Sequence, residues 1–424
     1  MSAAAVPVAS SPGAPTRRTR LARAAVAALF LTNGAVFFNV VPRYPEIKAD
    51  LGLSNVVFGT ALAGYPIGAL LAGLLAGAAI RRFRSARVAS FGIVVSTIAT
   101  LAVSVAPGWA ALGAVLFVAG ALDSVVDVAQ NTHGLRVQRL YGRSIVNSLH
   151  GLWSVGAVLG GLMGSAAAGL RVPLAIHLSV SAVLFGAVAL VAYRFLLPGP
   201  EDAERPAEAR EPAADGRAAV PPAGSGVRRA LTGSAVRMLA ALGVLAACGA
   251  LVEDAGASWG AIYLSGDLGT GAATAGLAVV ALQTAMTVGR LTGDRVVDRF
   301  GQRTVVRAGA VVAAAGMGAA LAVPSVPATL AGFALAGLGV ATLVPAAMHT
   351  ADELPGLPDG TGLTVVSWLL RGGFLLSPPL VGLVADLVGL RVGLLSVVLA
   401  GLVTAVLAGV LVNRTPAPGG RPSP

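Results

Sequence analysis

Residues 391–413 read RVGLLSVVLAGLVTAVLAGVLVN, and no ionisable side chain occurs from Val392 to Asn413. At about 1.5 Å per residue, roughly 20 such residues in an α-helix match the ~30 Å hydrocarbon core of a bilayer. The stretch is continuous and rich in Leu, Val, Ala and Gly, without the alternation of polar and apolar residues that marks a membrane β-strand. It therefore predicts a membrane-spanning helix.

Eleven similar stretches precede it, so the sequence predicts an all-α membrane protein with twelve transmembrane helices. The composition agrees, because 56% of the residues are hydrophobic and only 12% are charged, about half the charge of a soluble domain. The predicted spans are 22–42, 55–80, 87–107, 110–131, 145–169, 173–196, 237–258, 271–292, 304–323, 328–349, 362–386 and 391–413.

Arginines are concentrated in alternate connections between these spans, and so on one side of the membrane. Four groups lie on one side: Arg17, Arg18, Arg20 and Arg23; Arg81, Arg82, Arg84 and Arg87; Arg136, Arg139 and Arg143; and Arg295, Arg299, Arg303 and Arg307. Short cytoplasmic loops carry the excess of positive charge, so both termini are predicted to be cytoplasmic. Arg43, Lys48, Arg171 and Arg391 are exceptions on the opposite side.

Several functional classes are not expected. The net charge of +11 is spread over span ends instead of forming one basic patch, which argues against nucleic-acid binding. Cys248 is the only cysteine and allows no internal disulfide, while His177 and His349 have no metal-ligand spacing. We find no phosphate-binding loop and no nucleophile elbow. The sequence thus predicts no enzyme, metal or cofactor.

The chain divides into two halves. Residues 198–235 are rich in Pro, Glu, Asp, Arg and Gly, and are predicted to form a cytoplasmic linker between bundles at 17–197 and 236–413. Residues 1–16 and 414–424 are predicted cytoplasmic tails, the first of them disordered. Three features recur at an offset of 217: Arg82-Phe83 as Arg299-Phe300, Gly120 as Gly337 and Gly156 as Gly373. This register indicates a duplicated six-helix unit.

Residues 293–303, GDRVVDRFGQR, resemble the loop signature between the second and third helices of a half in the major facilitator superfamily. Residues 42–48, 127–131, 150–154 and 259–264 are similar to a bacterial inner-membrane branch distantly akin to the fucose permeases. The resemblance implies a major facilitator fold of two pseudo-symmetric six-helix bundles, acting as a monomer in the bacterial cytoplasmic membrane.

The resemblance also implies a gating loop. In the C-terminal copy, Asp298 is predicted to accept hydrogen bonds from a helix N-terminus, while Arg299 and Arg303, which flank Gly301, hold nearby carboxylates. For Arg303, a purely topological role is the alternative. The N-terminal copy departs from the pattern, because Arg81 replaces the acid and Arg84 replaces the glycine.

Ionisable residues inside the spans are costly, at roughly 2.5–3.5 kcal/mol each on insertion scales, so each needs a reason. Asp123 and Asp127 lie about 6 Å apart on one helical face, which Gln130 and Asn131 continue. A carboxylate there can bind a proton when it is desolvated and release it when a cavity opens. A structural hydrogen bond is the alternative for Asp127.

A second acidic site comprises Glu253 and Asp254, of which we expect only Glu253 to face the cavity; simple solvation is its alternative. Arg371 lies well inside the eleventh span and needs an acidic partner or an anionic substrate. Asp127 is the predicted partner, and pairing within the C-terminal half is the alternative.

Gln130 and Asn131 are also candidates for substrate binding. Asn33, Asn39, His150 and Trp153 are further candidates, with helix packing as the alternative for each. Together these residues predict a secondary transporter that moves a small organic solute by alternating access, coupled to protons. An uncoupled facilitator, or a membrane sensor or scaffold that transports nothing, is the alternative.

Overall fold

A computed structural model describes residues 15–141, 145–199, 233–354 and 361–412. Within these ranges, twelve helical segments are long and apolar enough to cross a membrane, which confirms the predicted number. Most residues of the predicted tails and of the predicted linker lie outside the described ranges.

The N-terminal half contains six spans. In chain order they are α1 (Arg17–Phe38) with η1 (Val41–Arg43) and α2 (Tyr44–Asp50); α3 (Asn55–Leu62) with α4 (Gly64–Gly73) and α5 (Ala76–Phe83); α6 (Ser85–Leu101) with η2 (Ala102–Val105); α7 (Trp109–Tyr141); α8 (Val146–Gly169); and α9 (Leu174–Tyr193).

The C-terminal half contains the other six. They are α11 (Gly233–Gly266); α12 (Ala272–Phe300); α13 (Gln302–Ala322); α14 (Val326–Val340) with α15 (Leu343–Asp352); α16 (Thr361–Val388); and α17 (Leu390–Gly393) with α18 (Leu395–Leu407) and η4 (Ala408–Val410).

Several helices extend beyond the apolar runs that predict them. Arg136 and Arg139 belong to α7, and Asp298 and Arg299 belong to the last turns of α12, so their predicted position in loops is wrong. Continuing a helix into the interface keeps the backbone hydrogen-bonded, and arginine side chains are long enough to reach water from there.

Close helix approaches repeat between the halves. Gly120 lies against the carbonyl of Tyr65, and Gly337 lies against the carbonyl of Leu282. The two glycines are 217 residues apart in the sequence, and so are Tyr65 and Leu282. A side chain at either glycine would collide with backbone, and only glycine permits these contacts. The offset seen in the sequence thus corresponds to a repeated packing contact.

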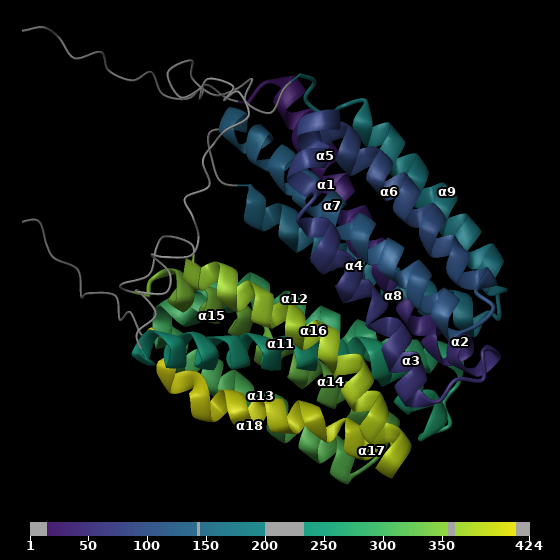
Figure 1. Cartoon of the computed structure of the whole chain (residues 1–424), viewed down its shortest axis with the longest axis vertical. Coiled ribbons are helices and arrows are strands. Elements are labelled where there is room, and N and C mark those ends of the chain that lie inside the picture. Colours follow the sequence, from purple (N-terminus) through teal and green to yellow (C-terminus); the bar gives the residue numbers. More distant parts are fainter. Residues whose placement is uncertain (1–14, 142–144, 200–232, 355–360, 413–424) are drawn as a thin grey trace, which may run out of the picture.

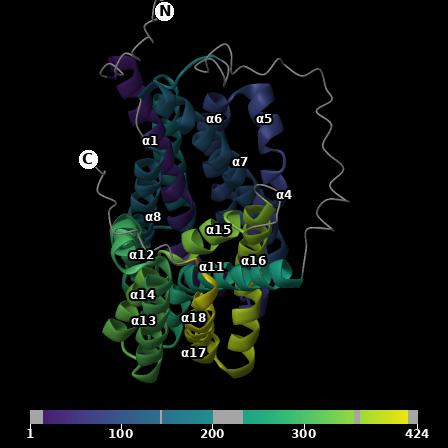
Figure 2. The same ribbon diagram turned by 90° about the vertical axis from the view of Figure 1, so that its left-hand side faces the viewer.

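The two bundles converge at one end and diverge toward the other (Figure 1). At the converging end α3 packs against α16, whereas α5, farther along the same span, packs against α6 and α7 of its own bundle. The bundles also join along α8 and α12, which lie next to each other (Figure 2). Gly151 lies against Leu291 and Gly169 against Ala273, so these two helices run antiparallel along their lengths.

Candidate functional site

A cavity of about 320 Å³ lies where the two bundles meet. Both halves contribute to its wall, and the N-terminal side comes from α1, α2, α3, α4, α7 and α8, while the C-terminal side comes from α11 and α16. Five of the predicted site residues line it: Asn33, Asp123, Trp153, Glu253 and Arg371. Residues from distant parts of the sequence thus form one polar site.

Aromatic side chains form much of the wall. Phe37, Phe38, Tyr44, Tyr65, Trp153 and Phe374 all line the cavity. The ring of Phe37 lies 4.6 Å from that of Tyr65, and the ring of Phe38 lies 6.0 Å from that of Trp153. Aromatic residues make up only 5% of the chain, so their concentration here was not visible in the composition. The wall suits a solute with an apolar or planar face.

Two carboxylates from opposite halves lie in this wall. Asp123 of α7 lies beside the side chain of Tyr65 on α4. Asp254 of α11 accepts a hydrogen bond of 2.9 Å from the Ser258 hydroxyl through Oδ1, while its buried Oδ2 has no hydrogen-bond partner. Ser377 of α16 lies beside the same carboxylate. The Asp254 carboxylate is therefore only partly satisfied by the protein.

Glu253 has stronger compensation. Its carboxylate lies 3.4 Å from the Arg290 guanidinium of α12, and Gln283 donates a hydrogen bond of 3.3 Å to it. The expectation that only Glu253 would face the cavity is wrong, because Asp254 lines it too. The cavity wall includes the part of the α11 surface that lies between α12 and α16. Glu253 lies on the α12 side, next to Arg290, and Asp254 lies on the α16 side, next to Ser377. The sequence reasoning missed Arg290, although an arginine inside the predicted span 271–292 was the available signal.

Arg371 is an exposed cation in the cavity wall. Among the residues that the structure describes, no carboxylate lies within ion-pairing distance of its guanidinium. The predicted direct pair with Asp127 is therefore not formed, although the two charges are close enough to interact. The exposed guanidinium therefore faces the cavity without a carboxylate partner among the described residues.

Asp127, Gln130, Asn131 and His150 form a separate network beside the cavity. The Asp127 carboxylate accepts hydrogen bonds from Gln130 at 3.3 Å and from Asn131 at 3.1 Å. His150 of α8 then lies 3.1 Å from the amide oxygen of Asn131. None of the four lines the cavity described above. Their hydrogen bonds connect α7 to α8.

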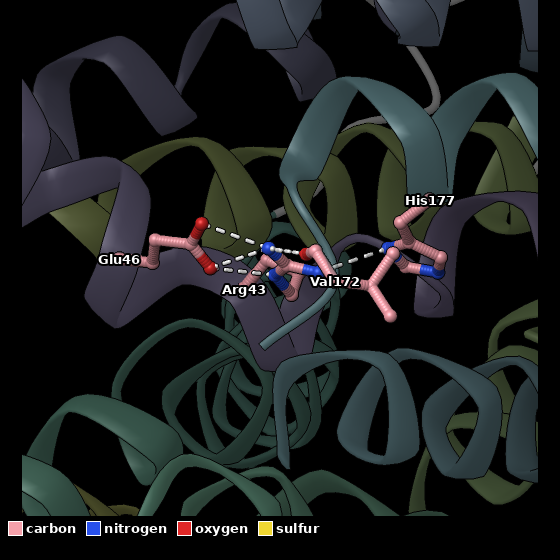
Figure 3. Close-up of polar contacts among 4 residues, drawn as sticks. All are labelled: Arg43, Glu46, Val172 and His177. Atoms are coloured by element: carbon pink, nitrogen blue, oxygen red, sulfur yellow. Dashed lines mark hydrogen bonds and ion pairs between the residues drawn. The ribbon is translucent and has the colours of Figure 1, made fainter. Parts of the chain in front are cut away.

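Asn39 lies in a buried cluster at the converging end of the N-terminal bundle. Its amide bonds to the Ser181 hydroxyl at 2.7 Å and to His177 at 2.9 Å. Arg43 follows in the same cluster, where it forms two hydrogen bonds with Glu46 and a third with the carbonyl of Val172 (Figure 3). Asn39 does not line the cavity, and Arg43, an exception to the charge rule, is neutralised by Glu46.

The converging end is closed by a contact between the halves. The backbone N–H groups of Asn55 and Val56, which begin α3, donate to the two carboxylate oxygens of Asp386 on α16 at 2.9 and 2.8 Å. Gly59 lies against the carbonyl of Pro378, and Gly382 lies against the carbonyl of Asn55. These contacts, which we call the outer closure, join residues more than 300 positions apart in the sequence. The outer closure comprises Asn55, Val56, Gly59, Pro378, Gly382 and Asp386.

Comparison with known proteins agrees with this architecture. The family model described as Major Facilitator Superfamily matches residues 26–253 and, a second time, residues 240–424. The chain belongs to the major facilitator superfamily. The two matches overlap within α11 and together run from residue 26 to residue 424, and the chain is a multi-pass membrane transporter, not an enzyme.

This major facilitator protein has relatives of similar length. It is 30% identical to "Uncharacterized transporter y4wD" of Sinorhizobium fredii, over 91% of this chain and 97% of that protein. It is also 30% identical to "Membrane protein MosC" of Rhizobium meliloti, over 91% of this chain and 89% of that protein.

Solved structures show the same major facilitator fold. A mutant of the nucleoside transporter NupG has a TM-score of 0.71 at 13% identity, covering 91% of this chain and 98% of that one. The major facilitator superfamily transporter FucP in the outward conformation has a TM-score of 0.58 at 14% identity, covering 93% of this chain and 99% of that one. At these identities the likeness concerns the fold alone.

The two copies of the major facilitator loop signature have the same backbone shape. Arg84 has φ 74° and ψ 148°, and Gly301 at the equivalent position has φ 80° and ψ 145°. Asp298 is exposed and has no hydrogen-bond or ion-pair partner among the described residues, while Arg303 donates to the carbonyl of Leu411 at 2.9 Å. The predicted lock at this loop is therefore not engaged in this conformation, in which the bundles diverge.

Proposed function

We propose that this major facilitator transporter moves a small organic solute across the bacterial cytoplasmic membrane by alternating access, coupled to protons. The observation that carries the proposal is the cavity between the halves, in which Asp123, Glu253, Asp254 and Arg371 lie among aromatic side chains. Charged groups are costly inside a membrane and are typical of substrate and proton pathways.

The conformation supports a rocking mechanism. The outer closure holds the bundles together at one end, and they diverge at the end that carries the arginine-rich turns. Because arginine-rich ends are cytoplasmic by the charge rule, the cavity faces the cytoplasm in this state, and both termini lie there. Rotation of the halves about α8 and α12 would then expose the same cavity to the other side.

Within this proposal, Asp123 and Asp254 are the groups suited to carry protons. Each belongs to a different half, and each would change its contact with water as the halves rock. Glu253 pairs with Arg290 of α12 and is better suited to position α11 against α12. Arg371 and Asn33, whose buried amide nitrogen has no partner, are suited to bind the solute. The protein acts as a monomer.

The test uses purified protein in proteoliposomes. A thermal-shift screen of small organic solutes selects a stabilising compound, and uptake of that compound is measured with and without an imposed pH gradient. We expect the gradient to drive accumulation, and Asp123→Asn and Asp254→Asn to abolish the accumulation while Asp267→Asn, a matched change outside the cavity, preserves it. Uptake that ignores the gradient would identify an uncoupled facilitator instead.

A further inference from the structure

A second cavity opens at the arginine-rich end of the N-terminal half and shares no lining residue with the cavity between the halves. Its volume is about 860 Å³, and it is formed by the start of α1, the junction of α5 and α6, and the end of α9. Five arginines line it: Arg17, Arg18, Arg84, Arg87 and Arg194. No acidic residue is part of this lining.

These arginines make few contacts with the protein. Arg87 reaches the Tyr193 hydroxyl at 3.5 Å, and none of the five has an ion-pair partner among the described residues. The C-terminal half uses its arginines differently: Arg303 donates to the carbonyl of Leu411 and Arg307 to that of Ala405, at the end of the last span. The positive charge of the N-terminal half is therefore available to an external ligand.

Arg84 carries the most specific signal. Its φ of 74° lies in a region that glycine adopts readily and other residues rarely adopt, and the equivalent position of the second half is Gly301. Glycine at this position is therefore sufficient to form the turn. A strained arginine in its place has no structural use that the described contacts reveal, whereas its side chain adds a fifth guanidinium to the cavity.

The surroundings indicate the ligand. Guanidinium groups bind phosphate through paired hydrogen bonds, and the cavity also presents the exposed apolar side chains of Leu21 (39% exposed) and Phe195 (44%). A ligand that satisfies both features has an anionic headgroup and an acyl chain. We propose that this cavity binds the phosphate headgroup of an anionic phospholipid in the leaflet at this end of the protein.

The test is the binding of defined lipids to the full chain. Detergent-solubilised protein is titrated with phosphatidylglycerol, phosphatidylcholine or inorganic phosphate, while melting temperature and retained lipid by native mass spectrometry are recorded. We expect only phosphatidylglycerol to be retained and to stabilise. Arg84→Gly should weaken its binding about fivefold, from about 1 kcal/mol per basic residue. The same variant should melt at a higher temperature than the wild type in phosphatidylcholine, because the strained turn is relaxed.

Two variants keep the test decisive. Arg194→Gln removes a cavity arginine without touching the strained turn, and should also weaken binding of phosphatidylglycerol. Arg299→Gln removes an exposed arginine from the equivalent region of the other half, and should leave the binding unchanged. Equal retention of phosphatidylglycerol by the wild type and Arg194→Gln, or equal stabilisation by inorganic phosphate, would overturn the lipid site. None of these measurements depends on the transported solute.

Discussion

Replacing Asp386 by alanine removes the acceptor that joins α16 to the first turn of α3. In the structure, both carboxylate oxygens of Asp386 are used, by the N–H groups of Asn55 and Val56 at 2.9 and 2.8 Å. These N–H groups have no partner within their own helix, because the first turn of any helix leaves its donors free. Water would replace the carboxylate in the variant, so α3 survives while the link between the halves is lost.

The size of the effect follows from known capping energies. An aspartate that caps a helix contributes about 0.5–2 kcal/mol, and a favourable charge near a helix N-terminus about 0.3–1 kcal/mol when it is exposed. Asp386 is exposed, so we take about 1–2 kcal/mol for the two bonds together. That energy stabilises the conformation with the outer end closed, and its loss should shift the closed-to-open ratio by about 5- to 30-fold.

Distances between spin labels can measure this shift. In a Cys248→Ser background, Val105→Cys and Val323→Cys place labels on exposed positions at the closed ends of the two halves, 74% and 68% exposed. We expect Asp386→Ala to increase the population with a long distance, and Asp386→Asn, which keeps one acceptor oxygen, to have a smaller effect. Asp267→Ala, an exposed acid with no bond to the other half, is the control. A distance distribution that Asp386→Ala leaves unchanged would refute the reasoning.

Three further variants probe the site and the closure. Arg371→Ala should abolish uptake of a selected solute in proteoliposomes, because it removes the exposed cation of the cavity; unchanged uptake would exclude Arg371 from the mechanism. Glu253→Gln should lower the free energy of unfolding by about 1 kcal/mol, because it leaves Arg290 unpaired, and thermal unfolding of the double variant with Arg290→Gln should show part of the loss recovered. Gly382→Ala should open the outer closure in the same label assay, because the new methyl group meets the carbonyl of Asn55, whereas Gly372→Ala on the same helix has open space and should change nothing.

The sequence predicts the membrane architecture well because insertion depends on each segment separately. A run such as 391–413 is apolar enough to span a bilayer whatever lies beside it, and all twelve spans have counterparts in the structure. The ends of helices are less accurate, as for α7 and α12, because the helical hydrogen-bond pattern continues past the point where hydrophobicity stops.

The site was predicted only in part. Asp123, Glu253 and Arg371 stand out as ionisable residues within apolar runs, and all three line the cavity. Asn39 is likewise a polar residue within an apolar run, yet it faces His177 and Ser181 inside the N-terminal bundle. A polar residue reveals that it needs a partner, but the rotation of its helix determines whether that partner is a solute or a neighbouring side chain.

Sequence alone predicted twelve spans, the duplication at an offset of 217 and an orientation set by arginines, because hydrophobicity, spacing and charge are properties of short segments. Tertiary structure alone decided that Tyr65 meets Asp123, that Arg290 holds Glu253, and that Asp386 caps a helix 331 residues away. Such contacts arise from how helices are rotated and how closely they approach. That arrangement is the result of packing over the whole molecule, and no single segment contains it.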